Sequence, residues 1–157
     1  MSESAQQHTY TVDAHGESAT RTAVETRGFE FVVDEPEALG GTNDGPNPVE
    51  YLLGSWAGCL NVVAHIVADD YDIEIDSLEI SLEGDLDPRK LQGVSDDARA
   101  GYQEIRVAID AETDADEERL QAWLEDVEQR CPVGDNLQHA TPTEIELVGE
   151  SVSVTSE

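Results

Sequence analysis

The feature that most constrains the fold is an apolar segment, residues 48–68, that begins with a complete set of helix-start signals. Asn47 stands at the N-cap and Pro48 at the first helical position. Glu50, at the third position, suits the reciprocal bond of a capping box. We therefore expect a helix from Pro48 to about Ala68.

Apolar residues cover most of the circumference of this helix. One stripe repeats at three- and four-residue spacing and three further residues widen it: Leu52, Trp56, Cys59, Val63 and Ile66, then Leu53, Leu60 and Val67. So much apolar surface predicts a central, buried helix. Small residues leave room for close approach of another backbone, either across a dimer or on a sheet: Gly54, Ser55, Ala57 and Gly58.

The segments around this helix alternate with the period of β-strands. We expect strands at residues 8–13, 20–25, 27–34, 76–86, 102–109, 144–148 and 152–154. A second helix is expected at 114–129, followed by a short helical turn from Cys131-Pro132. Residues 35–46 are rich in glycine and proline and predict a loop of a length that is often functional. This order predicts an α+β fold in a single domain, 1–157, with residues 1–7 frayed.

Acidic residues dominate the charge of the chain. There are 36 Asp and Glu against 8 Lys and Arg, a formal charge of -28, and Lys90 is the only lysine. Such a surface repels phosphate groups, so we expect neither nucleic acid nor a membrane as a partner. A carboxylate surface nearly free of lysine suits concentrated salt, where the Debye length is ~3 Å or less, and predicts an extreme halophile as the source.

Cys59 and Cys131 are the only cysteines and the candidate active site. No secretory leader and no run of some 18 apolar residues is seen, so we expect a cytoplasmic protein without a spanning helix. Stable disulfides are uncommon in that compartment. Cys131 precedes a helical turn whose free N–H groups stabilise a thiolate. The alternative is that Cys59 is a small buried hydrophobe and Cys131 a boundary residue without a role.

Other reactive side chains give weaker signals. A role in the capping box is sufficient to explain Glu50. Glu50 also lies at the start of the helix that carries Cys59, so it is a candidate to approach a bound oxidant. Histidines 8, 15, 65 and 139 lack metal-ligand spacing. The phosphate-loop pattern GxxxxGK[ST], the elbow GxSxG and the pair CxxC are absent. We therefore expect no metal and no cofactor.

Four separated motifs resemble the OsmC/Ohr superfamily. They are Val32–Gly41, Gly45–Leu53 continuing to Gly58-Cys59, Glu83–Pro88 and Arg130–Val133, in the family's order and with both cysteines in place. The resemblance implies an intertwined α+β homodimer, in which antiparallel sheets wrap around two long central helices.

The resemblance also implies a function, the reduction of organic hydroperoxides. Cys59 would be the peroxidatic thiol and form a sulfenic acid, Cys131 would resolve it as a disulfide, and a dithiol reductant would reopen that bond. Arg21, with Arg27 as the alternative, and Glu50 would activate Cys59.

This chain departs from the family pattern at one position. The hydroperoxide-resistance proteins carry their glutamate directly after the motif proline, where this chain has Val49 and places Glu50 one residue later. The departure resembles a less characterised OsmC-like subgroup. It leaves a second hypothesis open, a dimer that binds a small apolar ligand near Cys59 without peroxidase turnover.

Overall fold

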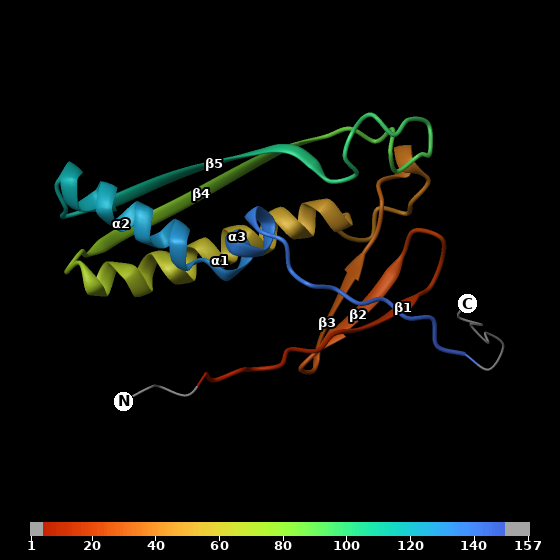
Figure 1. Ribbon diagram of the computed structural model, residues 1–157, viewed down its shortest axis with the longest axis horizontal. Helices are drawn as coiled ribbons and strands as arrows, with labels where there is room; N and C mark the ends of the chain where they lie inside the picture. Colours follow the sequence, from red (N-terminus) through yellow and green to blue (C-terminus); the bar gives the residue numbers. More distant parts are fainter. Residues whose placement is uncertain (1–4, 150–157) are drawn as a thin grey trace.

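The computed structural model describes residues 5–149 and combines antiparallel sheets with a long central helix (Figure 1). The elements, in chain order, are β1 (Asp13–Gly16), β2 (Thr22–Thr26), β3 (Phe29–Val33), the 3-10 helix η1 (Glu37–Leu39), α1 (Pro48–Asp70), β4 (Ile75–Leu86), β5 (Tyr102–Thr113), α2 (Glu117–Arg130) and α3 (Pro132–Gln138). The predicted α+β class is confirmed. Strands β1 to β3 form the amino-terminal sheet, and the elements from α1 to α3 form the helical body.

Helix α1 begins as its sequence predicts. The Asn47 side chain accepts a hydrogen bond from the Glu50 backbone N–H at 2.9 Å, and the Glu50 carboxylate accepts one from the Asn47 N–H at 2.8 Å. This reciprocal pair satisfies two N–H groups that a helix start leaves without partners. The capping box is therefore confirmed, and α1 runs two residues beyond its expected end.

One side of α1 forms the core of the helical body. Trp123 and Val127 of α2 pack against it, and the Trp123 Nε1 donates a hydrogen bond to the Ala64 carbonyl at 2.9 Å. The buried residues of α1 are Leu60, Val63, Ala64, Val67 and Ala68.

The predicted stripe on α1 is partly wrong. Leu52 is 38% exposed and Ile66 49%. The reason is that α2 and the β4–β5 hairpin cover only one side of the helix, so in the described part of one copy the apolar residues on the other side, Val62 among them at 56% exposed, have no covering element.

Helix α1 is long and apolar enough, by length and composition, to cross a membrane. The central helix of a globular protein passes the same test. Here α1 carries the core residues that pack against α2 and β4. This packing is the arrangement of a core helix.

Strands β4 and β5 form a long antiparallel hairpin that lies over the helices of the helical body (Figure 1). Its half-buried residues face each other in register, with Ile80 opposite Ile109 and Leu82 opposite Val107. The Tyr102 hydroxyl donates to the Val49 carbonyl at 2.8 Å. That bond ties the end of the hairpin next to the β4–β5 loop to the first turn of α1.

The amino-terminal sheet lies beside the start of α1 (Figure 1). Tyr51 joins the two: its ring lies 5.2 Å from that of Phe31, and its hydroxyl donates to the Val32 carbonyl at 2.7 Å. Within residues 5–149, no helix and no second sheet packs across this sheet. Phe29 is accordingly 60% exposed.

Two predicted strands near the chain's ends differ from the structure, and a third is not tested by it. The strand expected at 8–13 is wrong, because pairing with β2 begins only where Asp13 faces Glu25. The strand expected at 144–148 is not formed; Ile145 is 96% exposed there, and within residues 5–149 no backbone pairs with this segment. The strand expected at 152–154 lies outside the described residues.

Two further boundaries differ in the helical body. Strand β5 continues to Thr113 rather than stopping at Ile109. Helix α2 starts at Glu117 rather than 114, because the Asp116 side chain accepts a hydrogen bond from the Arg119 N–H at 2.9 Å and so sets the cap.

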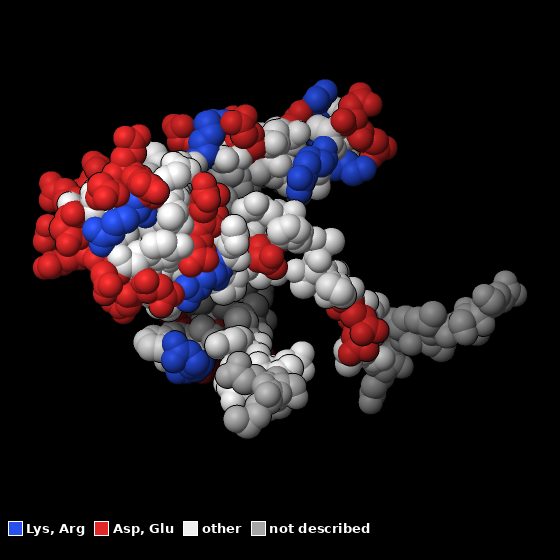
Figure 2. Space-filling model, turned by 60° about the vertical axis from the view of Figure 1, so that its left-hand side comes forward, with Lys and Arg blue, Asp and Glu red and all other residues white. Residues whose placement is uncertain are grey.

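On the face seen in Figure 2, acidic side chains gather densely at one end of the helical body. We expect the protein to melt at a higher temperature in about 1 M KCl than in about 0.1 M, because the Debye length falls from ~10 to ~3 Å and carboxylate repulsion weakens. Thermal unfolding followed by circular dichroism measures this difference. Near the sequence pI of about 4.1 the dependence should largely vanish. A melting temperature that does not respond to salt at neutral pH would contradict this expectation.

Candidate active site

The structure brings Cys59 and Cys131 into contact. Cys59 lies on α1 and Cys131 lies between α2 and α3, and their sulfur atoms are 3.0 Å apart. Both are free thiols; Cys131 is 1% exposed, and Cys59 is half-buried. A disulfide bond is ~2.05 Å long, so only a small approach of the two sulfurs would accompany their two-electron oxidation to a disulfide.

Cys131 is held by the break between two helices. Its backbone ends α2 in an extended conformation, and Pro132 starts α3 at once. The Gly134 N–H donates to the Cys131 sulfur at 3.4 Å. This is the kind of helix-start contact that stabilises a thiolate. The neighbouring Arg130 is engaged elsewhere, with Asp70 of α1 at 2.6 Å.

The surroundings of Cys59 disfavour its thiolate in one copy of the chain. Burial raises the pKa of the Cys59 thiol, and the nearby Cys131 thiol raises it further. A backbone hydrogen bond from Val133 lowers this pKa, but does not outweigh the burial. Among the described residues, no basic side chain contributes to the shift. Residues 5–149 of one copy therefore provide no cation that stabilises the Cys59 thiolate.

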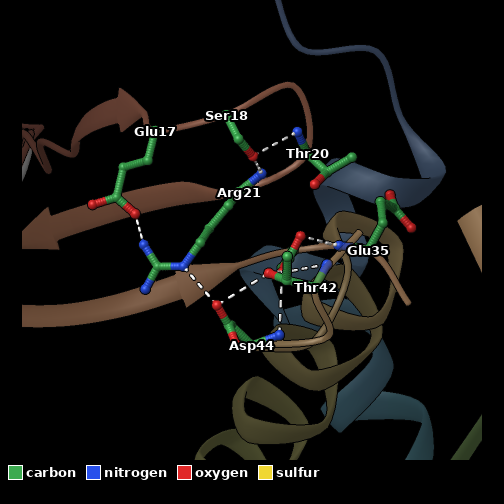
Figure 3. A network of polar contacts seen from close by, with 8 residues as sticks. Glu17, Ser18, Thr20, Arg21, Glu35, Thr42 and Asp44 are labelled. Atoms are coloured by element: carbon green, nitrogen blue, oxygen red, sulfur yellow. Dashed lines mark hydrogen bonds and ion pairs between the residues drawn. The ribbon is translucent and has the colours of Figure 1, made fainter. Parts of the chain in front are cut away.

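Arg21 lies on the amino-terminal sheet, in a polar network that does not include Cys59 (Figure 3). Its guanidinium pairs with Glu17 and, through Nε at 3.0 Å, with Asp44. Arg27, the alternative, lies in the turn between β2 and β3 with its guanidinium 5.2 Å from the centre of the Phe29 ring. One copy therefore brings neither arginine to Cys59.

The network around Arg21 is built on Asp34, which is fully buried. Its carboxylate accepts hydrogen bonds from the Thr42 hydroxyl at 2.5 Å and from the backbone N–H groups of Glu35, Thr42 and Asp44 at 2.8, 3.2 and 3.1 Å. The Thr42 hydroxyl bond, more than any other contact, holds the pKa of Asp34 well below its usual range, against the effect of desolvation. These bonds fold the 35–46 loop and fix Asp44, the partner of Arg21.

Glu50 lies far from Cys59 along α1. Nine residues separate them, which is about 13.5 Å of helix at 1.5 Å per residue. Its carboxylate is bound to the Asn47 N–H. Within one copy, Glu50 is observed in its cap role.

The histidines give no metal site. His65 lies on the exposed side of α1, where its Nδ1 is 2.8 Å from the Asn61 carbonyl. Within residues 5–149, no cluster of His, Cys, Asp or Glu has the arrangement of a metal site.

Sequence reasoning missed one residue beside the thiols, Trp56. Its place in the helical stripe predicts packing, yet its indole borders a cavity next to Cys131. The Trp56 Nε1 has no hydrogen-bond partner within residues 5–149. No sequence pattern predicts whether the N–H of a tryptophan has such a partner. The signal is visible only in three dimensions.

Known proteins share this fold and order of elements. A family model described as "OsmC-like protein" matches residues 41–146, more than half of the chain. The crystal structure of an OsmC-like protein from Mycoplasma pneumoniae is 21% identical with a TM-score of 0.75, covering 86% of this chain and 91% of that one. These matches support the antiparallel sheets and long central helix described above.

Two further solved structures carry a functional name. An organic hydroperoxide resistance protein OsmC from Legionella pneumophila is 21% identical, with a TM-score of 0.61 and coverage of 85% and 92%. The organic hydroperoxide resistance protein OhrB of Bacillus subtilis is 26% identical, with a TM-score of 0.57 and coverage of 85% and 93%. A search of curated proteins found no match. The family model and the shared fold establish that the chain belongs to the OsmC-like protein family.

Proposed function

We propose that the protein reduces organic hydroperoxides, with Cys59 as the attacking thiol and Cys131 as the resolving thiol. The 3.0 Å contact between the two sulfurs is the observation that carries this proposal. The assignment of roles follows from exposure, since a peroxide reaches the half-buried Cys59 more readily than Cys131, which is 1% exposed. The names of the Legionella and Bacillus structures point to the same substrate class.

The chemistry balances in three steps. The Cys59 thiolate attacks the terminal oxygen of the hydroperoxide, the O–O bond breaks, and the alkoxide takes a proton to leave as an alcohol. The Cys131 thiol then displaces water from the Cys59 sulfenic acid and forms the disulfide. A dithiol reductant opens that disulfide and is itself oxidised.

A second copy of the chain supplies what one copy lacks around Cys59. Within residues 5–149, the amino-terminal sheet has an uncovered face, and α1 has an apolar side without a neighbour. A sheet or helix of this kind is stable when another layer covers it. In a homodimer the sheet of one copy covers the helices of the other, and Arg21 of that sheet is the candidate cation for Cys59, with Arg27 as the alternative. Glu50 is the candidate partner of that arginine.

The dimer is directly testable. Val62→Asp should weaken it, because Val62 is 56% exposed in one copy and a carboxylate there would be buried against the second. Light scattering should give twice the 17.1 kDa chain mass for the natural sequence and a shift toward one chain mass for the variant. Gln121→Asp, which adds the same charge on the exposed face of α2, is the matched control. A natural protein of one chain mass would refute the dimer.

A further inference from the structure

Asp44 is a carboxylate that contacts Arg21 from outside the amino-terminal sheet (Figure 3). Arg21 comes directly before β2, and Asp44 lies in the loop that precedes α1. The Asp44 Oδ2 accepts a hydrogen bond from the Arg21 Nε at 3.0 Å. The Glu50 carboxylate, by contrast, is bound to the Asn47 N–H. In the described part of one copy, the acidic partners of Arg21 are therefore Asp44 and Glu17.

Asp44 is held in place by Asp34, which is fully buried. The Asp34 carboxylate accepts a hydrogen bond from the Asp44 N–H at 3.1 Å, and the Asp34 N–H donates to the Pro46 carbonyl at 3.1 Å. Between these two bonds, Gly45 allows a close approach to β3, because a Cβ there would collide with the Val32 carbonyl. The position of Asp44 is therefore set by backbone contacts and not by its own side chain.

The pair of Arg21 and Asp44 is not explained by stability. The Asp44 side chain is 52% exposed and the Arg21 side chain 31%. Exposed ion pairs contribute little to folding, because solvent screens them and two side chains lose freedom. What a fixed carboxylate does at such a place is select one orientation of a long, flexible arginine side chain.

Asp44 leaves part of the Arg21 guanidinium free to bind elsewhere. A guanidinium carries five N–H donors in a planar fork. Asp44 takes the Nε, and Glu17 pairs with one terminal nitrogen, Nη1. Within the described residues, the other terminal nitrogen, Nη2, makes no hydrogen bond or ion pair. Asp44 therefore orients the Nη2 group without using its donors.

We infer that Asp44 is a positioning residue for Arg21 and acts through Arg21 on Cys59 of the second copy. The inference rests on the proposed function, in which Arg21 of one copy stabilises the Cys59 thiolate of the other. Asp44 holds the Nε edge, so that a terminal nitrogen meets the thiolate from a fixed direction. Such a cation stabilises a thiolate more than one that spends time elsewhere, because the Coulomb interaction weakens with distance. In this role Asp44 touches no reacting atom.

The rate of Cys59 alkylation by iodoacetamide tests this role without any hydroperoxide, from about pH 6 to about pH 10 in a Cys131→Ser background. Asp44→Ala removes the acceptor of the Nε. It should slow alkylation at about pH 7 by about three- to tenfold and move the midpoint of the pH profile upward, because the thiolate is less stabilised. Asp44→Asn keeps an oxygen that accepts the Nε N–H and should restore part of that rate.

A double variant separates an effect through Arg21 from a direct one. Arg21→Gln combined with Asp44→Ala should be no slower than Arg21→Gln alone, because Asp44 has nothing left to orient. Glu37→Gln is the matched control, since it removes the same charge from an exposed position in the same loop and should alkylate at the natural rate. A double variant slower than Arg21→Gln would overturn the inference.

Other outcomes would also overturn it, and each has a distinct meaning. A natural rate in Asp44→Ala, where Arg21→Gln is slow, would refute the role of Asp44 alone. A faster rate in Asp44→Ala would mean that Asp44 masks the cation. A melting temperature of Asp44→Ala well below that of Glu37→Gln would assign Asp44 to folding instead. If Arg21→Gln keeps the natural profile, the activating role of Arg21 falls and this inference with it, whereas hydroperoxide reduction is judged by its own assay.

Discussion

Cys59→Ser should abolish the consumption of an organic hydroperoxide, whereas Cys131→Ser should consume about one equivalent and then stop. The difference follows from the two roles. Without the Cys59 sulfur no sulfenic acid forms, while without the Cys131 sulfur the sulfenic acid forms but has no thiol at 3.0 Å to resolve it. In the second variant, excess peroxide should carry Cys59 on to the sulfinic acid.

Mass spectrometry of the thiols checks these outcomes. In the natural protein, one equivalent of cumene hydroperoxide should remove two thiols and leave a Cys59–Cys131 disulfide; a dithiol should restore both. The double variant with both serines controls for peroxide lost without the protein's thiols. Equal, partial losses in the two single variants would mean that neither cysteine is a dedicated nucleophile.

The alternative function has its own signature in the same experiment. If both single variants keep full activity, or if the natural protein consumes no hydroperoxide, the thiols are packing residues. The hypothesis of a dimer that binds a small apolar ligand near Cys59 would then lead.

Local signals in the sequence predict the central elements well. The cap formed by Asn47 and Glu50 depends only on residues three apart, and the alternation of β4 and β5 reflects a hairpin buried on one face. The contact between Cys59 and Cys131 was less accessible, because it joins residues far apart along the chain. The family resemblance, rather than their spacing, implied it.

The errors share one physical cause. Each concerns whether another part of the protein covers a given helix face or pairs with a given strand, which local sequence does not encode. The periodicity of α1 shows that it is apolar around most of its circumference, but not that Leu52 and Ile66 are left exposed in one copy. The strand expected at 144–148 has the right alternation, but within residues 5–149 it has no backbone to pair with. Alternation alone therefore does not establish that a strand has a partner.

The same cause limits the prediction of the activating residues. Alignment with the family points to Arg21, yet within one copy Arg21 pairs with Glu17 and Asp44. Both acidic partners lie near it on the same sheet or loop, so the single chain offers it a complete set of counter-charges. In the proposed homodimer, a thiol of the second copy is the expected additional partner of Arg21.

Arg21→Gln should lower the reactivity of Cys59 at neutral pH by at least about tenfold, if Arg21 of a second copy faces that thiol. Burial already raises the pKa of Cys59, and a nearby cation opposes this by stabilising the thiolate. Removing the cation raises the pKa again, so a smaller fraction of Cys59 is thiolate at a given pH below it. At a pH above the Cys59 pKa of both the natural protein and the variant, Cys59 is fully ionised in each. The difference in reactivity between the two proteins should then disappear.

The rate of alkylation by iodoacetamide, measured from about pH 6 to about pH 10 in a Cys131→Ser background, reads this pKa directly. Arg27→Gln is the matched control, since it removes the same charge from the turn between β2 and β3. A loss confined to Arg27→Gln would move the activating role to Arg27. If neither substitution shifts the pH profile of alkylation, neither Arg21 nor Arg27 acts on Cys59. The reactivity of Cys59 should then follow the elevated pKa that its burial imposes.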